Sequence, residues 1–247
     1  VRWARLMPKQ LRVLELFAGI GGCAAAIGSR AEIVAAVDTD PAARVVYEHN
    51  FAHPFCAEPI ESLSSQWFQE QAADVWWMSP PTLPYAYAGL SRELDDPRSK
   101  AILNVIEQLA RVKPKYVVLE CVNEFNKSRT RQMLHEALTD AGYEWQETRL
   151  CPTELGIPNK RPRYYLVAGR AELRPWQPPK TNRQFTIAST LDQDSPDELR
   201  IAPELLAMHR GTMDLIDPSD LSAVTSSFTA DYGRSVNKTG SYVQTSD

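Results

Sequence analysis

The fold of this chain is decided by the stretch Leu11-Arg12-Val13-Leu14-Glu15-Leu16-Phe17-Ala18-Gly19-Ile20-Gly21-Gly22. Its first half has the apolar character and length of a buried strand, and a glycine-rich turn leads from it into the alanine-rich residues 23–29. A strand, a glycine turn and a helix in this order begin an α/β unit. Such a turn can approach a ligand closely, although a turn that only packs helix on strand needs glycines too. The turn also lacks the Gly-x-Gly-x-x-Gly spacing of dinucleotide-binding loops.

Apolar runs and helical patterns alternate further along the chain. We expect strands near residues 33–37, 74–78, 116–119, 144–150 and 164–168, and helices over residues 41–50, 101–112 and 130–141. Asp40 is the expected cap of the 41–50 helix, with Pro41 at its first position. This alternation predicts a doubly wound α/β sheet. Prolines cluster from about residue 175, so we expect a domain of residues 1–175 and a smaller region of residues 176–247.

The composition limits the class of protein. The 247 residues are 43% hydrophobic and 23% charged, which is ordinary for a folded globular protein. No apolar run reaches the length of a membrane span and residues 1–5 lack a signal-peptide core, so we expect a cytoplasmic location and no membrane partner. The four cysteines include no Cys-x-x-Cys pair, which predicts reduced thiols and no metal site.

Charge is unevenly distributed. The net charge of -4 argues against a protein that coats nucleic acid indiscriminately. Residues 156–183 nevertheless contain a single acid, Glu172, among these bases: Lys160, Arg161, Arg163, Arg170, Arg174, Lys180 and Arg183. The run indicates either a local basic face or an ordinary solvated surface.

Three polar residues directly follow expected strands, namely Asp38, Ser79 and Glu120. Open α/β sheets bind ligands along the edge formed by the carboxyl ends of their strands. We therefore expect a binding site at this edge, with Asp38 placed to bind ribose hydroxyls. Glu120 has a second interpretation, because an acid at a strand end can also cap a helix.

Five segments, in order, resemble the motifs of the cytosine 5-methyltransferase family. They are Phe17–Gly22, Ser79-Pro80-Pro81-Thr82-Leu83-Pro84-Tyr85, Asp96-Pro97-Arg98-Ser99, Glu120-Cys121-Val122, and Gly156–Ala168 with its Asn159-Lys160-Arg161-Pro162-Arg163 core. The resemblance implies a Rossmann-like fold that binds S-adenosylmethionine, followed by a small, partial target-recognition region.

One branch of the family fits best. Ser227-Phe228-Thr229, Tyr232-Gly233, Thr239-Gly240-Ser241 and Gln244 are similar to the Cys-Phe-Thr segment of the branch that methylates aspartate transfer RNA, and Asn159 also suits that branch. The branch closely resembles DNA methyltransferases. The resemblance therefore implies a nucleic-acid partner, with transfer RNA favoured over DNA.

The resemblance also implies roles for individual residues. The cofactor would be bound by Phe17, Gly19, Ile20, Gly21, Gly22, Asp38, Ile60 and Pro80. In the family's reaction a cysteine thiolate adds to carbon 6 of cytosine, which lets carbon 5 attack the methyl group. Glu120 would hydrogen-bond or protonate the adjacent ring nitrogen, and Arg161 and Arg163 would hold the base and the backbone.

The chain departs from the family pattern at the nucleophile. Thr82 stands in place of the family's cysteine, and Leu83 in place of the following glutamine. An alcohol is far less acidic than a thiol and needs a dedicated base. Cys121 replaces the asparagine of Glu-Asn-Val, Ser227 replaces the cysteine of Cys-Phe-Thr, and the sequence reaches Asp247 without the family's Gly-Asn-Ser segment.

Three explanations stay open. The chain is a pseudoenzyme that binds cofactor or nucleic acid, or it uses Cys121 as a relocated nucleophile, or its sequence is altered or shortened from its natural form. The alternative role of Cys121 is that of a small buried residue. A second chain is a candidate source of the family's C-terminal segment.

Overall fold

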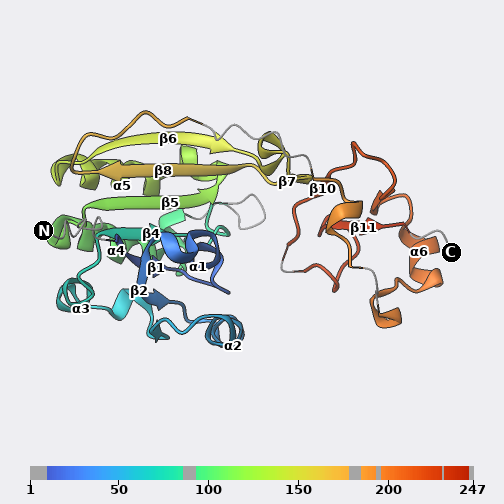
Figure 1. Cartoon of the computed structure of the whole chain (residues 1–247), viewed down its shortest axis with the longest axis horizontal. Coiled ribbons are helices and arrows are strands. Elements are labelled where there is room, and N and C mark those ends of the chain that lie inside the picture. The colour runs from blue at the N-terminus through green and yellow to red at the C-terminus, as the bar shows by residue number, and fades with distance from the viewer. Residues whose placement is uncertain (1–9, 86–92, 178–184, 193–195, 230, 245–247) are drawn as a thin grey trace, which may run out of the picture. The chain divides into compact units, whose positions relative to one another are not determined.

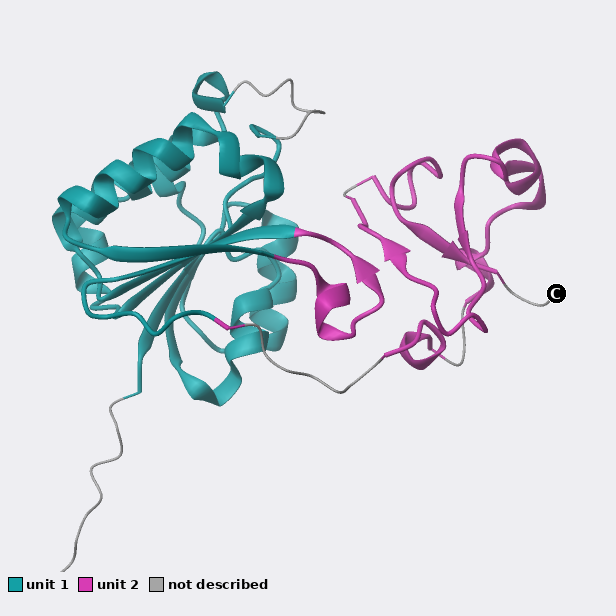
Figure 2. Cartoon of the chain, turned by 90° about the horizontal axis from the view of Figure 1, so that it is seen from above, with its two compact units in different colours: residues 1–149, 163–176 teal, residues 150–162, 177–247 magenta. Residues whose placement is uncertain are grey.

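The computed structural model describes residues 10–85, 93–177, 185–192, 196–229 and 231–244. The chain divides into two compact units, residues 1–149 with 163–176, and residues 150–162 with 177–247 (Figure 2). The expected boundary at residue 175 differs from this division for residues 150–162. That segment groups with the second unit, in which its strand β7 (Asn159–Lys160) pairs with β10 (Thr225–Ser226).

A seven-stranded sheet forms the centre of the described part of the first unit (Figure 1). Its strands are β1 (Arg12–Leu16), β2 (Glu32–Val37), β3 (Phe55–Cys56), β4 (Val75–Met78), β5 (Tyr116–Val122), β6 (Glu144–Leu150) and β8 (Arg163–Gly169). They lie in the order β3-β2-β1-β4-β5-β8-β6. The five strands from β3 to β5 run parallel, and β8 runs antiparallel to β5. The alternation in the sequence thus predicted the mainly parallel sheet and every strand of it except the two-residue strand β3.

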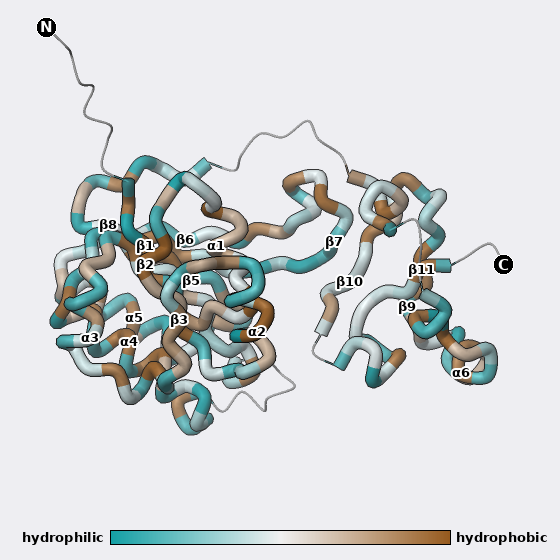
Figure 3. Tube along the Cα trace, turned by 60° about the horizontal axis from the view of Figure 1, so that its bottom comes forward, coloured by the Kyte–Doolittle hydropathy of each residue, from teal (hydrophilic) through white to brown (hydrophobic). Residues whose placement is uncertain are grey.

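Helices cover both faces of this sheet (Figure 2). The helices of the first unit are α1 (Gly22–Ile27), α2 (Pro41–Asn50), α3 (Ser65–Glu70), α4 (Ser99–Val112) and α5 (Arg129–Asp140). On one face, Ala24 of α1 and Tyr47 of α2 pack into a hydrophobic cluster with Val13 of β1. On the other face, α3, α4 and α5 pack into a larger cluster that includes Leu14 and Leu16. Figure 3 shows the hydrophobic character concentrated at β1 and β2.

The start of α2 confirms the predicted cap. Oδ1 of Asp40 accepts hydrogen bonds from the backbone N–H groups of Ala42 at 2.8 Å and Ala43 at 3.3 Å, and Pro41 occupies the first helical position. These bonds satisfy amide donors that the first turn of a helix leaves without intrahelical partners. The helix therefore begins where the sequence predicts.

Short elements make up the second unit. In addition to β7 and β10 it contains helix α6 (Pro203–His209) and the parallel strand pair β9 (Asp214–Ile216) and β11 (Ser241–Val243). The described residues also form 3₁₀ turns at Gly28–Arg30, Ile60–Ser62, Glu93–Asp95, Asn123–Lys127, Pro152–Leu155, Ala188–Thr190 and Asp197–Leu199. The absence of a βα unit in residues 196–229 agrees with the change of pattern in the sequence.

Candidate active site at the carboxyl edge of the sheet

One row of paired residues marks the carboxyl edge of the parallel strands. Leu16 of β1 pairs with Val37 of β2 and with Met78 of β4, and Met78 pairs with Leu119 of β5. The next residue on each strand is Phe17, Asp38, Ser79 and Glu120, respectively. The structure therefore brings Asp38, Ser79 and Glu120 to one edge, as the sequence predicts.

The glycine loop is held in an unusual backbone conformation at this edge. Phe17, Gly19 and Gly21 all have positive φ angles, of 58°, 53° and 94°. The carboxylate of Asp38 accepts hydrogen bonds from Gly19 N–H at 2.8 Å and from Asp40 N–H at 2.9 Å. Asp38 thus fixes the loop and is itself fixed in position beside it.

The loop has a closed side and an open side. A Cβ atom built on Gly21 would lie 2.4 Å from Cε2 of Phe51, so the chain has no room for a side chain there. A Cβ atom built on Gly19 would meet nothing within 4 Å. Close backbone approach on the open side is what a ligand-binding glycine loop requires.

The remaining predicted cofactor residues differ in exposure. Ile60 and Pro80 are buried, and Phe17 is half-buried. Ile20 is 63% exposed, and Gly22 lies exposed at the first position of α1. Ile20 therefore has a side chain that is free of the core and available to a ligand.

Glu120 and Arg163 form an ion pair on one face of the sheet. Nε of Arg163 lies 3.1 Å from Oε1 of Glu120, and both side chains are largely buried. Their pairing follows from the register, because Glu120 is opposite Tyr165 and Val122 is opposite Arg163. Residues two apart on a strand share a face, so Glu120 and Arg163 are diagonal neighbours. The structure thus joins two of the predicted catalytic residues.

Arg161 is placed differently. It is exposed and belongs to the second unit. Its role as a clamp stays a prediction. The basic residues on either side of β8 also do not form one patch: Arg163 begins the strand and Arg170 follows its other end, about 23 Å away at the usual rise of an extended chain. Lys180 and Arg183 lie outside the described residues.

Thr82 lies in the short loop after β4. It is half-buried, and its carbonyl accepts the backbone N–H of Tyr85 at 3.1 Å. Among the residues that the structure describes, none forms a hydrogen bond with the Thr82 hydroxyl. Leu83 is 46% exposed. The inability of Thr82 to replace the family's cysteine stays a prediction.

Cys121 has the environment of a core residue. Its side chain is fully buried in the cluster formed with α3, α4 and α5, whereas Glu120, the preceding residue on the strand, points to the opposite face. Burial raises the pKa of the Cys121 thiol to about 12. A reactive cysteine requires the opposite shift and an accessible sulfur. This placement counts against the predicted relocated nucleophile and favours the alternative, a small buried residue.

Reasoning from the sequence missed Glu15. This acid is 2% exposed in the middle of β1, and Oε1 accepts the backbone N–H of Cys23 at the start of α1 at 3.2 Å. A charged residue inside an apolar strand, Leu14-Glu15-Leu16, was the available signal. Within the described residues, no group of His, Cys, Asp and Glu side chains is arranged to bind a metal, and no helix is long and apolar enough to cross a membrane.

The chain is similar to known cytosine methyltransferases. It is 40% identical over 176 residues to the tRNA (cytosine(38)-C(5))-methyltransferase of Bos taurus, which covers 68% of this chain and 45% of that protein. It is 32% identical over 170 residues to the DNA (cytosine-5)-methyltransferase of Dictyostelium discoideum, which covers 66% of this chain and 45% of that protein. The chain thus spans about half the length of these relatives.

Solved structures agree with this similarity. The Dnmt2 methyltransferase of S. pombe superimposes with a TM-score of 0.84 at 28% identity, covering 97% of this chain and 77% of that chain. The Entamoeba histolytica methyltransferase EhMeth gives a TM-score of 0.88 at 26% identity, covering 95% and 76%. The predicted methyltransferase fold is confirmed. Residues 11–235 match the C-5 cytosine-specific DNA methylase family, so the chain belongs to this family, whose methyl donor is S-adenosylmethionine.

Proposed function

We propose that this chain binds S-adenosylmethionine at the carboxyl edge of its sheet and holds a cytosine of a transfer RNA for methyl transfer to carbon 5. The observation that carries the proposal is the row formed by Phe17, Asp38, Ser79 and Glu120. A cofactor loop and an acid that can bind the target base lie along one edge, and transfer between two bound molecules requires such proximity.

The residues of the loop fit the cofactor. Gly19 leaves an open side, and the carboxylate of Asp38 is oriented next to it by two backbone donors. Asp38 would accept hydrogen bonds from the ribose hydroxyls of the cofactor. Ile60 and Pro80 supply buried apolar surface. Phe17, Ile20, Gly21 and Gly22 complete the proposed cofactor-binding residues. When bound, S-adenosylmethionine supplies an activated methyl group on a sulfonium.

The Glu120–Arg163 pair fits the target base. Glu120 would hydrogen-bond or protonate ring nitrogen N3, which is conjugated with the C5=C6 double bond and gains negative charge as a nucleophile adds to carbon 6. Arg163 lies 3.1 Å from Glu120 and holds its carboxylate in one orientation. Arg161 would clamp the nucleic-acid backbone. The target base must leave its stack before it reaches these groups.

A second candidate function is non-catalytic binding of cofactor and nucleic acid. The observation that favours it is Thr82, whose hydroxyl has no base among the described residues. The buried Cys121 thiol offers no substitute. On this account the scaffold holds both molecules, and the addition to carbon 6 is the step that fails.

Transfer RNA is the favoured substrate. The bovine relative is named for cytosine 38 of tRNA, while the Dictyostelium relative is named for DNA. In the second unit, Nδ2 of Asn159 donates to Oγ1 of Thr225 at 2.8 Å and to the Ser226 carbonyl at 3.1 Å. These bonds tie the Gly156–Ala168 motif to the Ser227-Phe228-Thr229 segment that resembles the tRNA branch. The cytoplasmic location expected from the sequence is compatible with a tRNA substrate.

Two measurements test the proposal. Calorimetric titration with S-adenosylhomocysteine is expected to show binding, and the absence of binding would contradict both candidate functions. Methyl transfer to tRNA and to duplex DNA is then compared for the unsubstituted chain and for Thr82→Cys. A gain of at least about 10³-fold with Thr82→Cys on tRNA supports the methyl-transfer scaffold. If Thr82→Cys binds the cofactor and still transfers no methyl group, non-catalytic binding is the candidate function that remains.

A further inference from the structure

A buried carboxylate lies directly behind the glycine loop. Glu15 is 2% exposed, on the face of the sheet covered by α1 and α2. Oε1 accepts the backbone N–H of Cys23 at 3.2 Å, and Oε2 accepts the hydroxyl of Tyr47 at 3.1 Å. The Tyr47 hydroxyl also lies 3.2 Å from Nδ1 of His53. Four residues from β1, α1, α2 and the segment after α2 therefore share one hydrogen-bonded chain.

The directions of these bonds follow from counting protons. The hydroxyl of Tyr47 has one hydrogen, which it donates to the ionised Glu15. Its oxygen can then accept from His53 Nδ1 in the tautomer that carries the ring hydrogen on that atom. The series of hydrogen bonds runs from the half-buried His53 through the fully buried Tyr47 to Glu15. Glu15 also accepts a hydrogen bond from the backbone N–H of Cys23.

The same residues support the loop itself. The Tyr47 and Phe51 rings pack against each other in a tilted arrangement, with ring centroids 5.0 Å apart, and both rings contact the position that a Cβ on Gly21 would occupy. Asp38 holds Gly19 on one side of the loop, and Glu15 holds the Cys23 amide on the other. Such anchors help to hold Phe17, whose positive φ of 58° is costly for a residue other than glycine.

We propose that Glu15 is a positioning residue for cofactor binding: in its ionised form, held by Tyr47 and His53, it fixes the start of α1 and thereby the open side of the glycine loop. This inference rests on the proposed binding of S-adenosylmethionine. Hydrogen bonds to an ionised carboxylate are roughly twice as strong as those to a neutral acceptor, so protonation of Glu15 loosens the anchor.

The charge of Glu15 is open to titration. Burial raises the pKa of Glu15, while hydrogen bonds from Tyr47, Ala24 and Cys23 oppose that rise. The other titratable residues in this series of hydrogen bonds are Cys23, Tyr47 and His53. Burial raises the pKa of both the Cys23 thiol and the Tyr47 hydroxyl, so these two stay neutral at physiological pH.

Cofactor affinity and folding stability are expected to depend on pH in opposite directions. A carboxyl group with a raised pKa in the folded state adds stability at low pH, and this stability is lost as the pH rises through its folded pKa. Cofactor affinity has the opposite dependence, because the ionised form anchors the loop. A merely structural role would move affinity and stability together. Opposite slopes against pH are therefore the signature of a positioning role.

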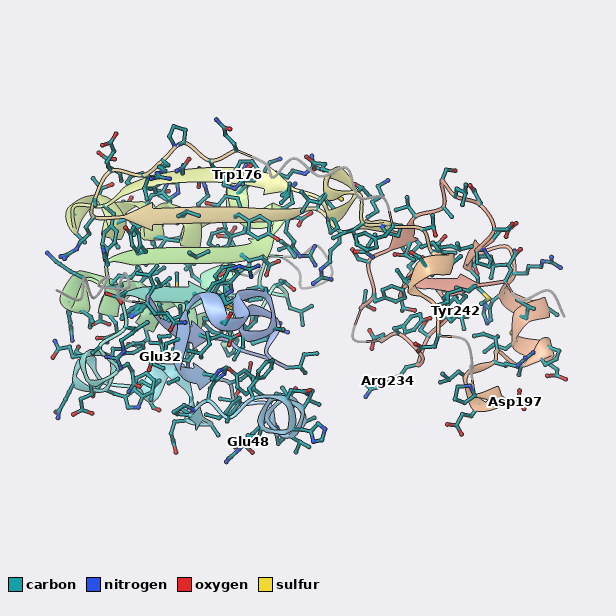
Figure 4. All side chains as sticks on the ribbon, viewed as in Figure 1. Glu32, Glu48, Trp176, Asp197, Arg234 and Tyr242 are labelled. Atoms are coloured by element: carbon teal, nitrogen blue, oxygen red, sulfur yellow. The ribbon has the colours of Figure 1, made fainter. Side chains whose placement is uncertain are left out.

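The experiment compares Glu15→Gln with Glu48→Gln in the full chain. Glu48, labelled in Figure 4, is an exposed acid of α2 paired with Arg44, so its substitution is a matched acid-to-amide control. Binding of S-adenosylhomocysteine is measured by calorimetry between about pH 5 and pH 9, with thermal unfolding in parallel. Glu15→Gln should weaken binding about fivefold at pH 7.5, remove the pH dependence and leave the melting temperature unchanged or higher.

The outcomes are distinct. Affinity of Glu15→Gln equal to that of the unsubstituted chain at every pH would overturn the inference, whereas no binding by the unsubstituted chain would overturn the proposed function instead. If Glu15→Gln does not fold, Tyr47→Phe replaces it. That variant removes a hydrogen bond that lowers the pKa of Glu15, so the midpoint of the affinity profile should move to higher pH. An unmoved midpoint contradicts the inference.

Discussion

Nε of Arg163 lies 3.1 Å from Oε1 of Glu120, across the antiparallel pair formed by β5 and β8. The pair lies directly beyond the row Val37–Leu16–Met78–Leu119 that ends the parallel part of the sheet. The reversed strand β8 therefore brings its first residue to the edge at which the parallel strands present their last. An acid and its orienting cation meet there through backbone register alone.

Removal of Arg163 should impair the reaction more than the fold. In the Thr82→Cys background, Arg163→Ala is expected to lower kcat/KM on tRNA by about 10²-fold, because Glu120 loses its orientation. Arg163→Lys keeps the charge but loses the planar donor geometry, so its kcat/KM should lie between those of Arg163→Ala and the Thr82→Cys parent. Steady-state methyl transfer measures both. Equal kcat/KM for Arg163→Ala and its parent would contradict the role of this pair.

The glycine loop predicts a graded series of alanine variants. Gly21→Ala places a Cβ 2.4 Å from Phe51 at a φ of 94° and should cost about 2–3 kcal/mol of unfolding free energy. Gly19→Ala meets no atom within 4 Å but has a φ of 53°, so it should cost about 1 kcal/mol. Gly22→Ala, without either problem, is the control. Urea unfolding measures the order, and an equal loss at Gly21 and Gly22 would be inconsistent with the structure.

The Cys121 thiol is expected to be unreactive toward alkylating reagents in the folded chain. At a pKa of about 12, roughly one thiol in 10⁴ is ionised at pH 8. Iodoacetamide should therefore label Cys121 only after unfolding, as mass spectrometry of native and denatured protein can measure. Cys121→Ser should cost about 1–3 kcal/mol by burying a hydroxyl, whereas Cys121→Ala should cost less. Rapid labelling of Cys121 in the folded chain would restore it as a candidate nucleophile.

Glu147 gives a separate prediction for acid stability. Burial alone would raise its pKa, but hydrogen bonds from Arg131 and Tyr164 outweigh burial and lower it. A carboxyl group with a lowered pKa contributes stability above its unfolded pKa, and this is lost as the pH falls through the folded pKa. Glu147→Gln should thus cost about 1 kcal/mol at pH 7, since the site is partly exposed, and almost nothing at pH 2. Urea unfolding at both pH values measures this, and a constant cost would contradict it.

Much of the fold follows from patterns in the sequence. The apolar run before the glycine turn, the Asp40 cap and the alternation of strands and helices predict β1, α2 and the mainly parallel sheet. The positions of Asp38, Ser79 and Glu120 follow as well, because a residue just past a parallel strand must reach the carboxyl edge. These features depend on local sequence or on rules that hold for all such sheets.

Other features depend on tertiary contacts. The strand predicted to end at Leu119 extends to Val122 because β8 pairs with its whole length. That extension is what sends Cys121 into the core and Glu120 to the other face. The role of Glu15 depends on Tyr47 and His53, which are distant in sequence. The supply of a segment by a second chain stays a prediction.

The choice between methyl transfer and non-catalytic binding depends most directly on whether Thr82 prevents covalent addition to cytosine. The measurement is formation of a covalent adduct with tRNA containing 5-fluorocytosine in the presence of S-adenosylmethionine, for the unsubstituted chain, Thr82→Cys and Cys121→Ala. We predict an adduct with Thr82→Cys alone. An adduct formed by the unsubstituted chain and abolished by Cys121→Ala would contradict the account, because it would show that the buried thiol is the nucleophile after all.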